Sequence, residues 1–284
     1  MKTLRNLPIF TCLFLLVLIP LSAAAVPPPS PAGGNYLALD GVDDHAILDF
    51  ETFGLLMPKD TDEFTFEAWI YPTELPDENL NAIILSQQVR IHAWDHDHDN
   101  LKLMVTAHVI LGPVHALIAF GHMKFSPNQW NHIAFQGGKE QKTTLIVNDN
   151  VRALLRQRII LAPDISHVGH PQDFTIGGFG ENIGSWIHGD HFWGHFAGYI
   201  DEVRISKVMR YNTAKRSFTP RTKFKNDAKT VALWHFDEPR GARKFLDISG
   251  NAYHLVGKNG AKTDGALGVE VAGKLAITWG RLKQ

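Results

Sequence analysis

The sequence is constrained most by its short runs of alternating polar and apolar residues, which begin near Tyr36 and continue along the chain. Side chains of a β-strand point to opposite faces in turn, so this alternation predicts strands with one buried face. In the run FTFEAWIY one face carries only apolar side chains, those of Phe64, Phe66, Ala68 and Ile70. Gly, Pro, Asn and Asp separate the runs, and no long stretch keeps helical periodicity. The pattern predicts an all-β protein with that face in its core.

A later run, from Tyr199 to Ile205, places an acidic residue beside apolar ones. Strict alternation sets one face as Tyr199, Asp201, Val203 and Ile205, opposite Ile200, Glu202 and Arg204. The Asp201 carboxylate is then either at the strand end, where it can be solvated or hold a cation, or buried with hydrogen-bond partners. The sequence leaves both possibilities open.

Residues 1–25 have the features of a secretory signal peptide, in which a positively charged start precedes an apolar run and then small residues. The apolar run, from Ile9 to Leu21, is shorter than the roughly 20 residues that a membrane anchor needs. We therefore expect cleavage after Ala25 and a protein that is secreted or displayed at the cell surface. The single cysteine, Cys12, lies in this segment, so the mature protein would have no disulfide and would depend on its core.

Cleavage would also change the charge and leave a chain that we divide into three parts. It removes two cationic residues, Lys2 and Arg5, and no acid, so the net charge of −1 becomes −3. No net basic field remains for nucleic acid or an anionic membrane. We expect a Pro/Gly-rich linker over residues 26–35, one β-sandwich over 36–226, and a C-terminal extension over 227–284 that packs on it. The alternative for the extension is the opening of a truncated second repeat.

Five short strings occur in an order that resembles a laminin-G-like jelly roll of the concanavalin A-like lectin and glucanase superfamily. They are LDGVDD at 39–44, FTFEAWI at 64–70, WNHIA at 130–134, IGG at 176–178 and GYIDEVRI at 198–205. The resemblance covers the chain from about residue 36 to 206 and implies an antiparallel β-sandwich of two sheets. This superfamily contains lectins, adhesion modules and glycosidases, so the resemblance leaves the function open.

Catalysis is disfavoured by the arrangement of acidic residues. Retaining glucanases of this superfamily carry Glu-x-Asp-x-x-Glu or a close variant, which places two carboxylates about 5 Å apart on one strand. The sequence has no such string, and its adjacent pairs Asp201–Glu202 and Asp237–Glu238 would point to opposite faces of a strand. No Gly-x-Ser-x-Gly elbow is present either. We expect no enzymatic activity, with a glycoside hydrolase or another carbohydrate-active enzyme as the alternative.

A calcium ion is the expected cofactor candidate. The turn from Asp40 to Asp44 offers the carboxylates and main-chain carbonyls that Ca²⁺ prefers. The resemblance implies calcium near such turns and suggests Asp40, Asp43 and Asp201 as its ligands. In the alternative, Asp40 only shapes a turn, while Asp201 pairs with Arg204 or caps backbone N–H groups. The sequence does not decide between them.

The segment from Gly184 to Phe196 is the main candidate for ligand contact, because it combines tryptophans, histidines and an aspartate between glycines. Flat aromatic faces beside hydrogen-bonding groups suit sugars and aromatic-rich peptides. The residues expected to bind ligand are Trp186, His188, His191 and Trp193 in this segment, and Trp69 on the sheet. Phe196 is expected to fill the core instead.

Histidines gather in residues 92–99 and again in 188–195. Imidazole with carboxylate suits Zn²⁺ or Cu²⁺, whereas an exposed turn is the simpler interpretation of the first group. Taken together, the sequence indicates a non-catalytic extracellular recognition module. Its expected partner is a glycan or an extracellular protein, with no nucleic acid and no membrane span in the mature chain.

Overall fold

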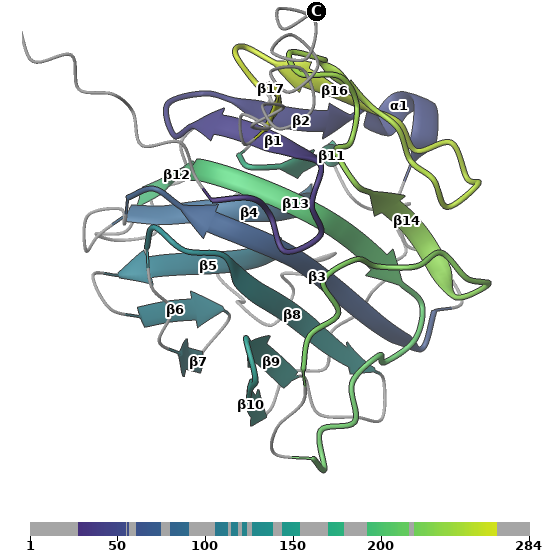
Figure 1. The fold of residues 1–284 in the computed structure, drawn as a ribbon. Helices are drawn as coiled ribbons and strands as arrows, with labels where there is room; N and C mark the ends of the chain where they lie inside the picture. Colours follow the sequence, from purple (N-terminus) through teal and green to yellow (C-terminus); the bar gives the residue numbers. More distant parts are fainter. Residues whose placement is uncertain are drawn as a thin grey trace, which may run out of the picture.

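The computed structural model describes residues 28–54, 56, 61–74, 80–90, 106–112, 115–118, 121–123, 127–138, 144–153, 170–178, 192–215 and 219–265. Two β-sheets pack against each other, with the short helix α1 (Phe50–Phe53) at their edge (Figure 1). None of the helices in this part of the chain has the length and apolar content that crossing a bilayer requires.

The first sheet is built from eight strands within the described ranges. They are β1 (Asn35–Asp40), β3 (Glu63–Pro72), β8 (Asn131–Gly138), β9 (Thr144–Val147), β10 (Asn150–Ala153), β13 (Ala197–Ser206), β14 (Thr230–Trp234) and β17 (Lys262–Gly265). Their order is β10-β9-β8-β3-β13-β1-β17, and β14 also pairs with β13. Strand β13 pairs with β3 along one edge, while β1 and β14 share its other edge. Every pair in this sheet is antiparallel.

The second sheet contains nine strands among the residues that the structure describes. They are β2 (His45–Leu48), β4 (Leu80–Arg90), β5 (Thr106–Gly112), β6 (His115–Ile118), β7 (Gly121–Met123), β11 (His170–Ile176), β12 (Phe192–His195), β15 (Lys244–Phe245) and β16 (Leu255–Lys258). Their order is β15-β16-β2-β11-β4-β5-β6-β7. Strand β12 lies parallel to β4, and the other pairs are antiparallel. The predicted two-sheet sandwich is confirmed.

The core lies between the sheets and contains the face that alternation predicts for β3. Its four apolar residues are buried in one cluster, as Phe64, Phe66, Ala68 and Ile70. Strands β4 and β11 contribute Ile84, Phe174 and Ile176 from the opposite sheet. Phe196, expected to fill the core, is fully buried there.

Strand β13 departs from the alternation that the sequence suggests. Asp201 pairs with Trp69 and Arg204 with Glu67, so two residues of β13 face one residue of β3 between these pairs. This is a β-bulge, and its residue Glu202 has a φ of 54°. After the bulge, each side chain points to the face opposite to the one that strict alternation predicts, so Val203 lies in the core. The prediction that Val203 shares a face with Asp201 is therefore wrong.

The two ends of the described chain pack on the sandwich. Strands β14 and β17 extend the first sheet, and β15 and β16 extend the second. At the N-terminal side, the Ser30 hydroxyl is buried and donates to Asp201, and the Trp130 indole donates to the carbonyl of Pro28 at 3.0 Å. This part of the predicted linker is therefore held against the first sheet by hydrogen bonds. The predicted signal peptide, residues 1–25, lies outside the described residues.

Candidate functional site

The outer face of the first sheet is covered by residues 207–229, which we call the strap. It leaves β13 at Lys207 and returns to β14 at Lys229, and all but residues 216–218 are described. The N–H of Lys207 donates to the carbonyl of Lys229 at 2.9 Å, which closes the base of this long connection. The strap therefore crosses the sheet while its two ends stay together (Figure 1).

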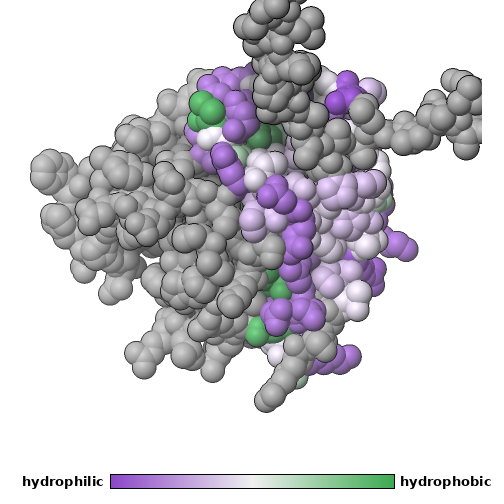
Figure 2. All heavy atoms as spheres, turned by 60° about the vertical axis from the view of Figure 1, so that its left-hand side comes forward, coloured by the Kyte–Doolittle hydropathy of each residue, from purple (hydrophilic) through white to green (hydrophobic). Residues whose placement is uncertain are grey.

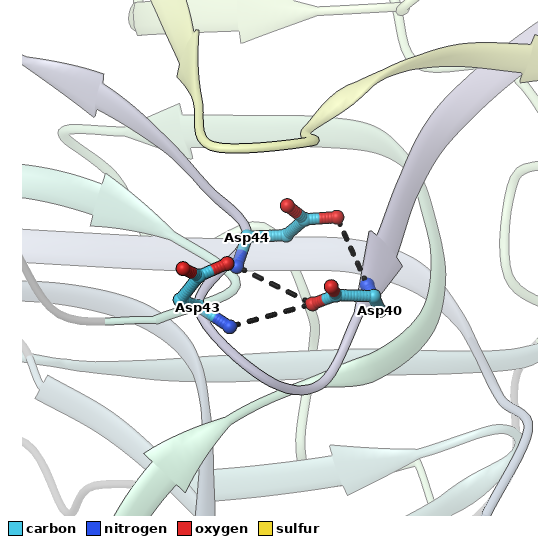
Figure 3. Close-up of side chains that lie close together, drawn as sticks. All are labelled: Asp40, Asp43 and Asp44. Carbon is cyan, nitrogen blue, oxygen red and sulfur yellow. Dashed lines mark hydrogen bonds between the residues drawn. The ribbon is translucent and has the colours of Figure 1, made fainter.

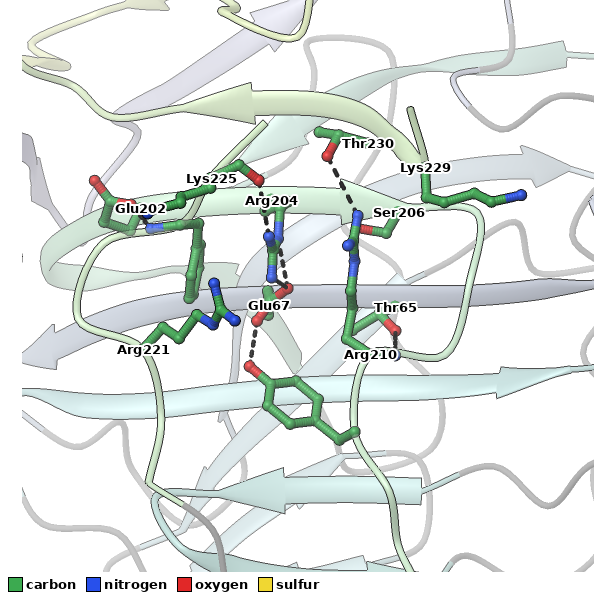
Figure 4. Close-up of polar contacts among 12 residues, drawn as sticks. Thr65, Glu67, Glu202, Arg204, Ser206, Arg210, Arg221, Lys225, Lys229 and Thr230 are labelled. Carbon is green, nitrogen blue, oxygen red and sulfur yellow. Dashed lines mark hydrogen bonds and ion pairs between the residues drawn. The ribbon is translucent and has the colours of Figure 1, made fainter. Parts of the chain in front are cut away.

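A buried polar cluster lies beneath the strap, with Glu67 at its centre (Figure 4). The Arg204 guanidinium donates to one Glu67 oxygen at 2.7 Å, and the Tyr211 hydroxyl donates to the other. His132 Nε2 lies 3.7 Å from the second oxygen. Burial alone would raise the pKa of Glu67, but its interactions with His132, Arg204 and Tyr211 outweigh burial and lower that pKa. Glu67 is therefore an ionised, fully paired carboxylate.

Side chains of the sheet bind the main chain of the strap. Four strap carbonyls accept hydrogen bonds from the sheet at 2.7 to 3.1 Å, pairing Val208 with Thr65, Tyr211 with Gln136, Arg221 with Trp69, and Lys225 with Arg204. The N–H of Phe224 donates to Glu202 at 2.6 Å. The Phe224 ring is buried in a cluster with Trp69 and Leu233. The main chain of the strap and the Phe224 side chain therefore occupy the outer face of the first sheet.

Trp69, a predicted ligand-binding residue, lies in this filled region. Its side chain is 9% exposed, and its indole N–H donates a hydrogen bond to the Arg221 carbonyl at 3.1 Å. Glu202 nearby is also buried and contacts His235 Nδ1 at 2.5 Å. These groups contact other parts of the same chain, so they present little surface to a ligand.

A second cluster lies in the turn between β1 and β2, where Asp40, Asp43 and Asp44 come together (Figure 3). Each offers a carboxylate oxygen, and these oxygens lie within 4.8 Å of one another. One Asp40 oxygen accepts the N–H of Val42 at 2.8 Å and longer contacts from Asp43 and Asp44 at 3.4 Å. These N–H groups outweigh partial burial and lower the pKa of Asp40. Asp40 therefore shapes the turn and stays ionised.

The turn is joined to neighbouring segments through Asp44 and His45. Asp44 accepts the N–H of Gly260 at 2.5 Å, from the connection between β16 and β17. His45 Nδ1 lies 2.9 Å from the carbonyl of Asp43, and its Nε2 is buried without a hydrogen-bond partner among the described residues. The ring of His195 lies 5.8 Å from that of His45, and burial lowers the pKa of His195. The end of the sandwich thus combines carboxylates with two imidazoles.

Asp201 occupies a different environment from Asp40 and Asp43. It is fully buried, accepts the Ser30 hydroxyl on one oxygen, and accepts the N–H of Glu202 on the other at 2.8 Å. Burial raises the pKa of Asp201 well above its usual range. The structure brings Asp40 and Asp43 together with Asp44, which belongs to the same DGVDD string but was not singled out from the sequence.

The other predicted ligand-binding residues are only partly covered by the described ranges. Trp186, His188 and His191 lie outside them, as do residues 92–99. Trp193 belongs to strand β12, where its backbone pairs with Asn81 of β4. The sequence placed Trp193 in an irregular connection, and the buried cluster around Glu67 was not predicted. Glu67 stands between the apolar residues Phe66 and Ala68 in β3, which was the available signal.

The comparison with family models agrees with the observed fold. A laminin G family model, described as the concanavalin A-like lectin/glucanases superfamily, matches residues 40–214. Among solved structures, the chain is similar to a proposed carbohydrate-binding protein from Bacteroides ovatus, with 17% identity and a TM-score of 0.49, over 82% of this chain and 60% of that one. It is also similar to domains LG4-5 of the mouse laminin alpha1 chain, with 12% identity and a TM-score of 0.35, over 67% of this chain and 45% of that one.

The chain therefore spans less than two thirds of either solved structure. A search of the curated proteins found no match. The family match is the comparison that decides membership, since it covers more than half of the chain and includes the turn at Asp40 and the whole of β13. The protein belongs to the concanavalin A-like lectin/glucanases superfamily.

Proposed function

We propose that the protein is a non-catalytic carbohydrate-recognition module that is exported through its signal peptide. The superfamily is named after lectins and glucanases, two classes of protein that bind carbohydrate. One observation supports the absence of catalysis in this proposal: the strap covers the outer face of the first sheet. Its central carboxylate, Glu67, is buried under the strap and held by Arg204.

Asp201 and Asp40, like Glu67, do not suit glycoside hydrolysis. That reaction needs two carboxyl groups on either side of the scissile bond, one of them a proton donor with a raised pKa. Asp201 has a raised pKa but is fully buried and hydrogen-bonded to Ser30. Asp40 is exposed but has a lowered pKa. These properties favour binding over turnover.

The surface chemistry also favours a polar ligand. On the face shown in Figure 2, the described residues are mainly hydrophilic, and hydrophobic ones form small separate areas. Extended apolar interfaces need larger contiguous patches. A protein partner is the second candidate, favoured by the exposed apolar side chains of Leu246, Ile248 and Val256 around β15 and β16.

A glycan array probed with the exported protein tests the proposal. We expect binding, with Trp186 or Trp193 as the main contact, because aromatic anchors commonly dominate recognition. Trp186→Ala or Trp193→Ala should then weaken binding by roughly 2 kcal/mol or more without a large change in melting temperature. Normal binding by both variants would exclude this contact site. Absence of binding to every glycan would contradict the proposed function and leave the protein partner as the candidate.

Calcium is proposed to bind at the turn that holds Asp40 and Asp43, with Asp44 as a further oxygen donor. An ion that binds only the folded state raises its stability by mass action. Millimolar Ca²⁺ should therefore raise the melting temperature, and Asp43→Asn should reduce that rise, whereas the exposed Asp149→Asn should not. Melting curves that are identical with calcium and with chelator would contradict the proposal.

A further inference from the structure

The strap is strongly cationic, whereas the chain as a whole is slightly acidic. It contains a single acid, Asp227, and the net charge of the full chain is −1. Its eight cationic residues are Lys207, Arg210, Lys215, Arg216, Arg221, Lys223, Lys225 and Lys229. Positive charge is therefore concentrated in one segment, and the remainder of the chain carries a net negative charge.

Most of these cations are available to a ligand. Two are paired: Arg210 makes two contacts with Asp227, at 2.5 and 2.8 Å, and Lys223 lies 2.7 Å from Asp237. Five others are exposed and make no ion pair with any residue in the described ranges. These five are Lys207, Lys215, Arg221, Lys225 and Lys229.

The sheet fixes the main chain that carries these side chains. Trp69 donates a hydrogen bond to the carbonyl of Arg221, and Arg204 donates one to the carbonyl of Lys225. The ring of Phe224, which lies between these two residues in sequence, is buried. Figure 4 shows Arg221 and Lys225 on the strap, where it crosses the sheet. Anchoring through the backbone leaves the cationic side chains in solvent on a preorganised support, which lowers the entropic cost of binding.

We propose that the outer surface of the strap binds an anionic polysaccharide whose units carry carboxylates or sulfates. This inference rests on the proposed carbohydrate recognition and names its ligand class. Several exposed cations on one segment favour a charged polymer because binding releases the counterions of that polymer. The guanidinium of Arg221 can also donate two hydrogen bonds to one carboxylate or sulfate. The acidic remainder of the chain would repel a polyanion, so the strap would hold its charged groups.

Binding of the exported protein to dextran sulfate, dextran and polygalacturonate tests this inference, since the first two differ only in their sulfates. We expect binding to both anionic polymers that weakens steeply as salt increases, and no binding to dextran. The double variant Arg221→Gln/Lys225→Gln should bind about tenfold more weakly, equivalent to about 1.4 kcal/mol. The control Lys244→Gln/Lys262→Gln removes the same charge at exposed positions outside the strap and should bind normally.

The melting temperature of each variant establishes whether it folds. If Arg221→Gln/Lys225→Gln does not fold, Lys207→Gln/Lys229→Gln replaces it as the strap variant. Equal weakening by the strap and control variants would overturn the inference, because binding would then follow net charge alone. Equally tight binding to duplex DNA would overturn it as well. Binding restricted to neutral glycans on the array would refute the anionic ligand while leaving the proposed function intact. Failure to bind any glycan would instead refute the proposed function.

Discussion

At the scale of single residues, the buried ion pair between Glu67 and Arg204 limits which substitutions the outer face of the first sheet tolerates. Arg204 Nη2 lies 2.6 Å from Glu67 Oε1, and both side chains are nearly inaccessible to water. A buried pair adds little net stability relative to apolar residues, but removal of one partner leaves a desolvated charge. The pair therefore matters chiefly because neither member can be changed alone.

Glu67→Gln should lower the free energy of unfolding by about 3 to 5 kcal/mol, because it leaves the Arg204 guanidinium buried without a counter-charge. Urea denaturation measures this loss, and the exposed Glu51→Gln in α1 is the matched control, with an expected change below about 0.5 kcal/mol. Since the pKa of Glu67 is lowered in the folded state, its contribution is present above its unfolded pKa and lost as pH falls through the folded value. Equal stability of the two variants would contradict this assignment.

Asp201 should have the opposite pH dependence, because burial raises its folded pKa, with Glu202 and Asp237 adding repulsion. The protonated carboxyl is favoured in the folded state, so stability is present at low pH and lost as pH rises through the folded pKa. Asp201→Asn cannot ionise and should melt above the wild type at pH 8, with a smaller difference at pH 4. If the variant instead melts below the wild type at pH 8, and calcium widens that difference, Asp201 is a calcium ligand.

The sequence predicted some of these residue environments. Phe196 is buried as expected, and Asp201 caps a backbone N–H group, which was one of its two open interpretations. Arg204 was considered as a partner of Asp201 but pairs with Glu67. That partner could not be predicted because it depends on the register between β13 and β3 and on the bulge at Glu202, and neither leaves a periodic signal in the sequence.

At the scale of elements, the strap is the feature that sequence patterns could not reveal. Its polar, basic composition is typical of a solvated connection, yet Phe224 is 1% exposed and Tyr211 contacts the buried cluster. These anchors have no helical or strand periodicity, because the strap follows the shape of the sheet and not a regular backbone geometry. By contrast, the buried face of β3 was predictable, since a regular strand alternates its faces.

Phe224→Ala tests how firmly the strap is held. Loss of a buried phenylalanine typically costs about 3 to 5 kcal/mol, and here it would remove the ring that packs with Trp69 and Leu233. Trypsin should then cleave faster at the lysines and arginines of residues 207–229, which mass spectrometry of the fragments would locate. Phe53→Ala, at a side chain that is 37% exposed, should leave both stability and cleavage nearly unchanged. Unchanged cleavage in the Phe224 variant would contradict the anchoring role.

At the scale of the whole molecule, two packed sheets follow from many short alternating strands, since each strand must bury one face. Strand order does not follow from alternation. The chain places β1 and β14 on the same edge of β13, and it sets β12 parallel to β4. These pairings join segments that are distant in sequence, so they depend on packing of the complete fold.

The architecture separates the covered face of the first sheet from the exposed surfaces that we propose for recognition. The first sheet binds its own strap through Gln136, Trp69 and Arg204, so contacts with an external ligand are left to the strap surface and to other exposed parts of the fold. A protein built in this way can hold a carbohydrate without placing a pair of catalytic carboxylates against it. Non-catalytic carbohydrate binding is the central proposal for the molecule as a whole.

Native mass spectrometry of the exported protein, mixed with oligosaccharides of defined length prepared from polygalacturonate and from dextran sulfate, tests this claim most directly. One spectrum series reports both the complex and the fate of the sugar. We predict a complex whose mass equals protein plus intact oligosaccharide, unchanged over hours of incubation. Shorter sugars that accumulate with time, and that disappear when one Asp or Glu is substituted, would show that the protein is an enzyme. Absence of any complex with these sugars would contradict the account.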